Sequence, residues 1–227
     1  MRYYPINLDL KGRPVLVVGG GGVAEGKAEQ LVEAGAQVRV VSPTLTARLQ
    51  ELVGRGVIGH RRGAFAESDL DGVKLVISAT DDQEVNEAVA RAAATREVLC
   101  NVVDQPALCD FITPALVTRG DLQISISSGG GSPSLVQRVK REVAALIGEE
   151  YGALLELAAE LREAAKQRVP DFERRRTLLH AFVESEAIEL LREGRRVDAQ
   201  RIARDLLAAA EDRPETSTQH PEMRVAG

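Results

Sequence analysis

Four consecutive glycines, Gly19 to Gly22, separate a short apolar run from a segment with helical spacing. Gly19, Gly21 and Ala24 match the pattern G-x-G-x-x-A, in which small residues permit a tight turn and let the backbone approach a phosphate. The N–H groups at the start of the following helix favour the negative charge of a pyrophosphate. Because the pattern lies in the first strand-to-helix turn, it predicts a dinucleotide-binding loop.

The acidic residue that usually selects NAD is missing after the second apolar run. The sequence there is Val41-Ser42-Pro43-Thr44, without an Asp or Glu to hold the ribose hydroxyls. No arginine follows at once to accept the 2′-phosphate of NADP, since Arg48 lies further into the next helix. We expect NAD, while the missing acid leaves NADP open.

Asp104 directly follows another apolar run, residues 98–103. Ligands of open α/β sheets bind outside the carboxyl ends of the strands, so a catalytic carboxylate is expected at such a position. Spacing alone supports a second interpretation equally, in which Asp104 caps the turn before Pro106. The pair Asp81-Asp82 is better explained as the N-cap of a helix.

The elements that carry these residues alternate between short strands and amphipathic helices. Strands are expected at residues 14–18, 38–41, from 57–58, 75–79 and 98–103. Helices are expected at residues 23–34, after a cap at 42–43, and around 85–92. The alternation predicts an α/β fold with a Rossmann-like, doubly wound parallel sheet covered on both faces.

The pattern changes near residue 105. Leu122 to Ser127 alternates apolar and polar residues, which is typical of a half-buried antiparallel strand, and residues 119–121 are its expected turn from a strand at 115–118. Ser132-Pro133 begins a helix that reaches Leu146. We expect an NAD-binding domain at 1–112, a short antiparallel connector at 113–147, a small all-helical domain at 148–211 and a disordered tail at 212–227.

Composition excludes several classes of protein. The net charge of −5 argues against binding to nucleic acid or to an anionic membrane. No apolar run reaches the roughly 20 residues that span a bilayer, and residues 1–5 lack the apolar segment of a signal peptide. We expect a cytoplasmic protein in which Cys100 and Cys109 are reduced packing residues. The histidines lack metal-ligand spacing, so no metal site is expected.

Five motifs follow one another along the chain. They are residues 19–28, residues 78–82 followed by Val85-Asn86, residues 100–104, residues 111–114 and residues 127–133. Together they resemble the sirohaem synthase family, in its precorrin-2 dehydrogenase/sirohydrochlorin ferrochelatase module. The resemblance runs from Pro5 to about Leu146, and residues 173–176 also fit. Larger members fuse this module to a methyltransferase, and we expect the stand-alone form because the chain ends before such a domain.

The resemblance implies oxidation of precorrin-2 to sirohydrochlorin with NAD and, in many members, insertion of ferrous iron to give sirohaem. Asp104 stands at the position of the family's catalytic aspartate, and one carboxylate could accept protons in both steps. The NAD site is expected at Gly19, Gly21, Gly22, Val23, Ala24, Pro43, Thr44 and Thr80.

The implied substrate is a multiply carboxylated tetrapyrrole, which requires basic and polar side chains. The candidates are Asn101, Ser128, Arg138 and Arg141, together with Lys140 and residues 174–176. The basic candidates are equally explained as solvated helix faces, and Ser128 as a turn residue. In the family this serine position can be phosphorylated. The resemblance also implies a homodimer formed by the hairpin at 115–127 and the helix at 133–146, which makes 113–147 a dimerisation connector and 148–211 a substrate-side domain.

Two alternatives remain. One is a dehydrogenase without chelatase activity, or a chelatase for cobalt or nickel. The other belongs to a different class, a non-catalytic NAD-sensing module. A sensor would need the glycine loop but neither the segment that carries Asp104 nor a helical domain of tetrapyrrole size.

Overall fold

The computed structural model describes residues 3–212, which form two compact units. Within this range the first unit comprises residues 3–114 and 128–133, and the second comprises residues 115–127 and 134–212. The hairpin segment and the helix after it therefore group with the C-terminal helices. Residues 213–227 of the expected tail lie outside the described residues.

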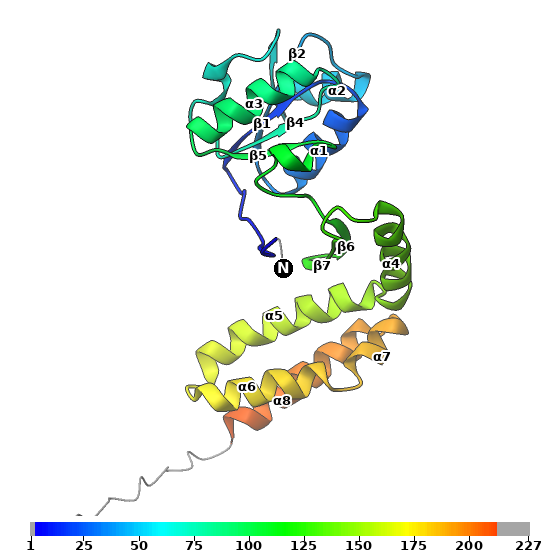
Figure 1. The fold of residues 1–227 in the computed structure, drawn as a ribbon. Coiled ribbons are helices and arrows are strands. Elements are labelled where there is room, and N and C mark those ends of the chain that lie inside the picture. Colours follow the sequence, from blue (N-terminus) through cyan, green and yellow to red (C-terminus); the bar gives the residue numbers. More distant parts are fainter. Residues whose placement is uncertain (1–2, 213–227) are drawn as a thin grey trace, which may run out of the picture. The chain divides into compact units, whose positions relative to one another are not determined.

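The first unit contains a five-stranded parallel sheet with the strand order β3-β2-β1-β4-β5 (Figure 1). Its strands are β1 (Pro14–Val18), β2 (Gln37–Ser42), β3 (Gly59–Arg62), β4 (Leu75–Ser78) and β5 (Leu99–Val102). Its helices are α1 (Gly22–Glu33), α2 (Ala47–Gly54) and α3 (Gln83–Thr95), with short 3-10 turns η1 (Glu67–Leu70) and η2 (Pro106–Leu108). The chain order reverses between β1 and β4, the position at which open α/β sheets bind ligands. The predicted Rossmann-like sheet is confirmed.

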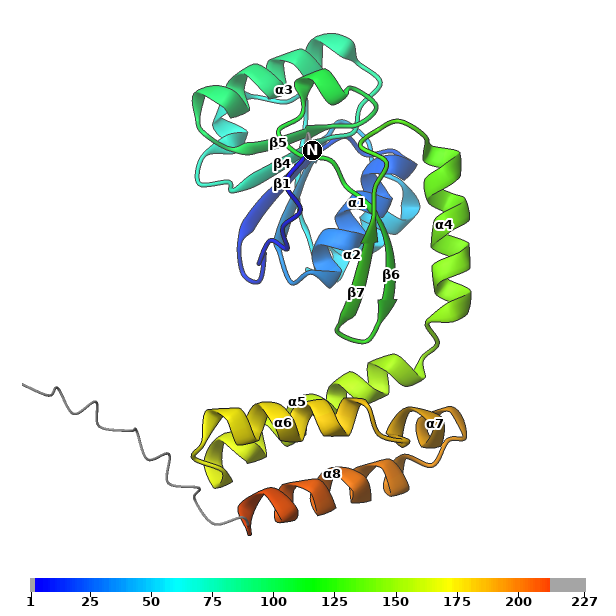
Figure 2. The same ribbon diagram turned by 60° about the horizontal axis from the view of Figure 1, so that its bottom comes forward.

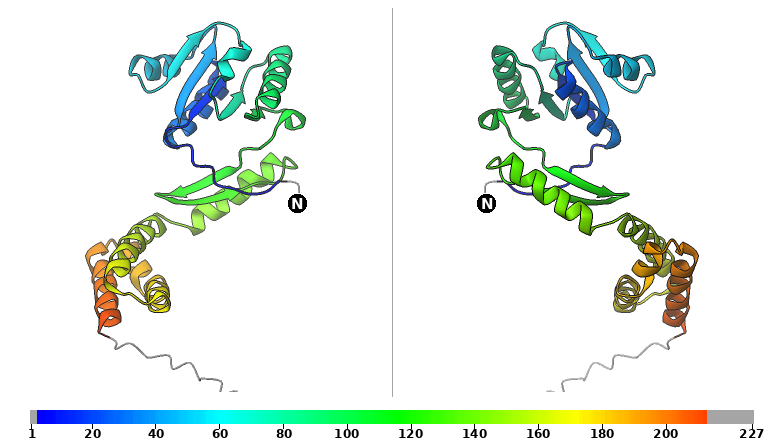
Figure 3. Two further views of the ribbon diagram at one scale, coloured as in Figure 1. Left: turned by 90° about the vertical axis from the view of Figure 1, so that its left-hand side faces the viewer. Right: turned by 90° about the vertical axis from the view of Figure 1, so that its right-hand side faces the viewer.

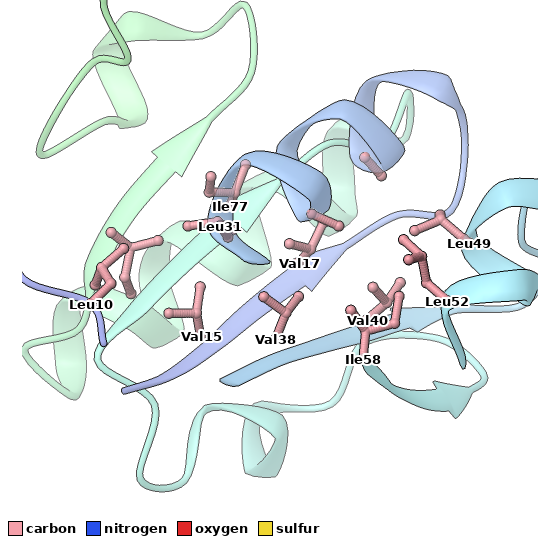
Figure 4. Close-up of a cluster of buried hydrophobic side chains, with 13 residues drawn as sticks. Leu10, Val15, Val17, Leu31, Val38, Val40, Leu49, Leu52, Ile58 and Ile77 are labelled. Atoms are coloured by element: carbon pink, nitrogen blue, oxygen red, sulfur yellow. The ribbon is translucent and has the colours of Figure 1, made fainter. Parts of the chain in front are cut away.

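The central strand β1 is buried on both faces, as its unbroken apolar sequence predicts. Val15 and Val17 belong to the core cluster that contains the buried residues of α1 and α2 (Figure 4). Leu16 and Val18 belong to a second cluster, which contains the buried residues of α3. Two helices thus cover one face and one helix covers the other.

Two boundaries differ from those expected from the sequence. The third strand begins at Gly59, because Ile58 is buried in the first core cluster ahead of the strand. The cap of α2 is Thr46, whose hydroxyl oxygen accepts a hydrogen bond from the Leu49 N–H at 3.2 Å. Ser42 cannot serve there because it is still the last residue of β2.

The expected N-cap of α3 is confirmed. One Asp82 carboxylate oxygen accepts hydrogen bonds from the backbone N–H groups of Glu84 at 3.0 Å and Val85 at 3.1 Å.

The second unit joins an antiparallel hairpin to helices (Figure 2). Its elements are β6 (Ala115–Arg119), β7 (Leu122–Ile126), α4 (Pro133–Leu146), α5 (Glu150–Arg168), α6 (Phe172–Val183), α7 (Ala187–Arg192) and α8 (Arg196–Glu211). Helices α5, α6 and α8 lie side by side around one apolar core (Figure 3). Helix α4 contains no buried residue. Every helix within residues 3–212 is too short or too polar to cross a lipid bilayer.

Arg119 joins the hairpin to the end of α4. Its guanidinium donates to the carbonyl oxygens of Ile147 at 2.8 Å and Ala144 at 2.9 Å. The last carbonyls of a helix have no intrahelical donor, so this arginine satisfies two of them.

Candidate functional site

A pocket of about 580 Å³ lies at the carboxyl edge of the sheet in the first unit. Its lining comes from the ends of β1, β2, β4 and β5 and consists of residues 19–23, 42–44, 79–81 and 103–105 together with Asn86. The structure therefore brings most of the predicted NAD residues beside Asp104. Ala24 does not line this pocket, because its side chain is buried in the core under α1.

Gly19 and Gly20 are required by the packing of the turn. Gly19 has a φ of 121°, and a Cβ atom there would overlap the carbonyl oxygen of Ala79. A Cβ on Gly20 would overlap the carbonyl oxygen of Thr44. The Gly19 N–H donates to the Val41 carbonyl at 2.9 Å, so the turn is held tightly against the neighbouring strand ends.

Gly21 and Gly22 meet no such restriction. A Cβ atom on either residue would have no neighbouring atom within 4 Å, and the φ of Gly21 is −85°. Gly21 is the N-cap of α1, where no side chain accepts from the first N–H groups. Open space beside unsatisfied N–H donors suits the close approach of a phosphate, and the fold itself does not explain glycine at these two positions.

A buried polar network fixes the turn after β4. The Ser78 hydroxyl donates to the Asn86 side-chain oxygen at 2.7 Å, and the Asn86 amide donates to the Thr80 carbonyl at 3.0 Å. Asn86 is 3% exposed and lines the pocket. Sequence reasoning did not assign it to the site, although a polar residue on the buried face of the expected helix was a detectable signal.

Asp104 is an exposed residue of the pocket wall with a φ of 60°. Aspartate tolerates this left-handed conformation better than most residues, but it is uncommon outside glycine. Within residues 3–212 the Asp104 side chain makes no hydrogen bond. The structure therefore does not show the turn-capping contact of the second interpretation, and the catalytic role stays a prediction.

Lys27 is a further charged group in this region, which sequence reasoning missed. It follows Val23 by one helical turn on α1, and its ammonium donates to the Thr113 hydroxyl at 2.8 Å. Burial lowers the pKa of Lys27, while the negative charge of Asp104 acts in the opposite direction.

Two of the predicted substrate residues lie in the first unit away from the pocket lining. Asn101 is 6% exposed in β5, and its amide donates to the Phe111 carbonyl at 2.9 Å. Ser128 is exposed, and its hydroxyl oxygen accepts from the Ser132 N–H at 3.0 Å. The first contact holds the chain after β5, and the second closes the glycine-rich turn.

The predicted basic substrate residues belong to the second unit. Arg138 and Arg141 are exposed on α4, where Arg138 pairs with Glu142 at 2.8 Å. Arg174 donates to a carbonyl near the end of α8, and Arg175 donates to the carbonyls of residues 169 and 170. The last two guanidiniums thus have structural partners within their own unit.

The two cysteines are free and well packed. Burial raises the pKa of the Cys100 thiol to about 12. The Cys109 sulfur accepts from the Val102 N–H at 3.2 Å. In the described part of the chain, no group of three or more His, Cys, Asp or Glu side chains could hold a metal ion.

Three family models match consecutive parts of the chain. A model described as NAD(P)-binding matches residues 6–115, the central region of sirohaem biosynthesis proteins matches 119–146, and the sirohaem synthase dimerisation region matches 150–207. The boundary of the first model coincides with the end of the parallel sheet domain.

Curated relatives and a solved structure agree with these matches. The siroheme synthase of Methylococcus capsulatus is 41% identical over 94% of this chain and 46% of its own length. That of Methylobacillus flagellatus is 47% identical over 78% of this chain and 38% of its own length. The chain thus spans about half the length of the curated relatives it matches.

The structure of the precorrin-2 dehydrogenase SirC is 29% identical and has a TM-score of 0.75, covering 93% of this chain and 100% of that one. Since sequence and fold agree over nearly all of residues 6–207, the chain belongs to the sirohaem synthase family.

Proposed function

We propose that this chain binds NAD and oxidises precorrin-2 to sirohydrochlorin, with Asp104 as the catalytic carboxylate. The observation that carries the proposal is a pocket in which the open glycines Gly21 and Gly22 share a wall with Asp104. The solved precorrin-2 dehydrogenase, which matches along its whole length, supports the choice of substrate. When bound, NAD supplies the acceptor for a hydride.

The residues present fit this cofactor. Gly21 and Gly22 leave space for the pyrophosphate at the N-terminus of α1, and Pro43 and Thr44 form the pocket wall after β2, where the adenosine ribose is expected. Arg48 pairs with Glu29 and Glu51, both at 2.8 Å, and these two carboxylates compete with the 2′-phosphate of NADP for its guanidinium. These contacts favour NAD.

Asp104 has a defined task in the balanced reaction. Oxidation of precorrin-2 removes one hydride and one proton, and the hydride goes to NAD. We assign the proton to the Asp104 carboxylate, which lies on the pocket wall and makes no hydrogen bond within residues 3–212. Insertion of ferrous iron releases two pyrrole protons, and the same carboxylate is the proposed acceptor for that second activity.

We also propose a homodimer. Helix α4 buries none of its residues within the described chain, although Val136, Val139 and Val143 share one face at helical spacing. The match to a dimerisation region at 150–207 supports a dimer, although this region begins after α4. Light scattering at micromolar concentration is expected to give twice the chain mass, and a monomer would contradict this proposal.

The decisive experiment mixes the purified chain with NAD and precorrin-2. We expect stoichiometric formation of NADH together with the change in the absorption spectrum that accompanies oxidation of the macrocycle. Ferrous iron, cobalt or nickel added afterwards to sirohydrochlorin tests chelation separately. NAD binding without any spectral change would overturn the enzyme assignment in favour of a sensing module.

A further inference from the structure

Lys27 is a cation whose ammonium has a fixed position near the pocket. Its side chain is half-buried, and the hydrogen bond to Thr113 at 2.8 Å ties helix α1 to the segment that follows β5. Val23, one helical turn earlier on the same face, is part of the pocket wall. All these residues belong to the first unit.

The charged neighbours of Lys27 differ from those of several surface arginines. Arg48 and Arg138, for example, contact carboxylates directly at the surface. Within the described range Lys27 forms no ion pair within 4 Å. Asp104 lines the same pocket as Val23, one turn before Lys27 on α1, and its negative charge favours the charged form of the lysine. Burial opposes the charged form of a lysine, so a cation kept at this position requires a compensating negative charge.

The Asp104 carboxylate is the negative charge that can compensate Lys27. Its backbone is in the left-handed region, it is exposed on the pocket wall, and its carboxylate makes no hydrogen bond within residues 3–212. The negative charge of an anionic substrate disfavours the charged form of a carboxylate beside it. A nearby fixed cation reduces that repulsion without occupying the carboxylate oxygens.

We infer that Lys27 is a positioning residue for the proposed reaction, in which its Thr113-anchored ammonium holds the charged Asp104 carboxylate ready at the pocket wall. The inference rests on the proposed function for its catalytic part. Lys27 acts through Asp104 and does not itself exchange a proton with the substrate. Two other roles make different predictions, since Lys27 could merely tie α1 to residue 113 or could bind a substrate carboxylate directly.

A double-mutant cycle distinguishes these roles. Lys27→Met should lower kcat for precorrin-2 oxidation by about 10-fold or more while KM changes less than about 2-fold, and Lys27→Arg should recover most of the loss. In an Asp104→Asn background the same Lys27→Met change should cost no further activity. Thr113→Val removes only the hydrogen bond and should cost less than Lys27→Met.

Three results would overturn the inference. A loss that appears in KM, with kcat preserved, would show direct binding of the substrate. Equal losses with and without the Asp104 carboxylate would show that the two residues act independently. Equal losses of activity in Thr113→Val and Lys27→Met would show that Lys27 only ties α1 to residue 113.

A second measurement needs neither cofactor nor substrate. Lysines are reductively methylated with ¹³C-formaldehyde, and the Lys27 signal is identified by its absence in Lys27→Met. Asp104→Asn should move the titration midpoint of this signal to lower pH, because it removes the negative charge that favours the ammonium. Asp81→Asn, which changes another carboxylate of the pocket wall, should leave the midpoint in place.

An unchanged midpoint in Asp104→Asn would overturn the coupling between Lys27 and Asp104, whatever the chain catalyses. A shifted midpoint combined with no oxidation of precorrin-2 by the unsubstituted chain would overturn the proposed function and the catalytic part of the inference, and would retain the electrostatic contact. The two failures are therefore distinguishable.

Discussion

Replacing Gly21 by aspartate should separate the stability of the fold from its capacity to bind NAD. Gly21 is the N-cap of α1 with an extended ψ of −175°, and a Cβ atom there has no neighbour within 4 Å. Aspartate is a preferred N-cap residue because its carboxylate accepts from the first N–H groups, and it restricts the unfolded chain more than glycine does. We expect the free energy of unfolding to stay constant or to rise by about 0.5–1 kcal/mol.

The same substitution should oppose cofactor binding. The new carboxylate would occupy the N–H groups proposed for the pyrophosphate and place a negative charge beside it. Two like unit charges about 4 Å apart repel by ~1 kcal/mol in water and by ~4 kcal/mol at an effective dielectric constant of ~20. Since ~1.4 kcal/mol corresponds to a factor of ten, the Kd for NAD should rise between about 5-fold and about 1000-fold.

Calorimetric titration with NAD and urea unfolding of the same preparations test both expectations. Gly26→Ala is the matched control, because Gly26 lies in α1 with equally open surroundings but is not part of the pocket wall. It should stabilise the helix by about 1 kcal/mol and leave the Kd unchanged. Unchanged NAD affinity in a folded Gly21→Asp variant would refute the placement of the pyrophosphate.

Four further outcomes are expected. Gly19→Ala should lower the free energy of unfolding by at least ~2 kcal/mol in urea titrations, because the new Cβ would overlap the Ala79 carbonyl at a φ of 121°; a variant of full stability would show that the turn rearranges. Asp104→Asn should lower both NADH formation and iron insertion by roughly 10²-fold with NAD affinity retained, and full chelatase activity would restrict this carboxylate to the redox step. NAD should bind at least ~10-fold more tightly than NADP by calorimetry. If NADP instead binds equally well and Arg62→Ala removes its binding, the 2′-phosphate is held by Arg62, an exposed residue of β3 that pairs with Ser42 at the end of β2. Cys100 should resist alkylation at pH 9 until the chain unfolds, since burial raises its pKa to about 12. Its contribution to the free energy of unfolding is fully present below the pKa of an unfolded thiol, ~8.5, and is lost as the pH rises toward 12. Rapid labelling of folded protein, measured by mass spectrometry, would contradict that burial.

The sequence predicted the sheet because most of its strands are buried on both faces. The unbroken apolar runs of β1 and β4 are typical of central strands in a parallel sheet that helices cover on both faces. The edge strand β3 was misplaced, since Gly59-His60-Arg61-Arg62 carries no apolar periodicity. Its position is set by backbone pairing with β2, which a pattern of side chains does not report.

The glycine motif combines two different constraints. Gly19 and Gly20 are glycine because the turn packs against the carbonyls of Ala79 and Thr44. Gly21 and Gly22 are unconstrained by the fold and leave the space that the proposed ligand requires. The pattern marks Gly19 and Gly21 alike and leaves Gly20 and Gly22 unspecified, and only the structure separates residues that build the turn from those that face the pocket.

The partners of Lys27 could not be predicted from the helix that carries it. Its neighbours on the helix, Ala24, Ala28 and Leu31, are all buried, so a lysine between them is a cation at the margin of an apolar core. That position alone indicates that a compensating group must exist, but the hydroxyl of Thr113 and the charge of Asp104 come from a segment far along the chain. The partners of a half-buried charge near a cofactor loop are expected among the residues that follow the other strands, because the carboxyl ends of parallel strands meet at the same edge.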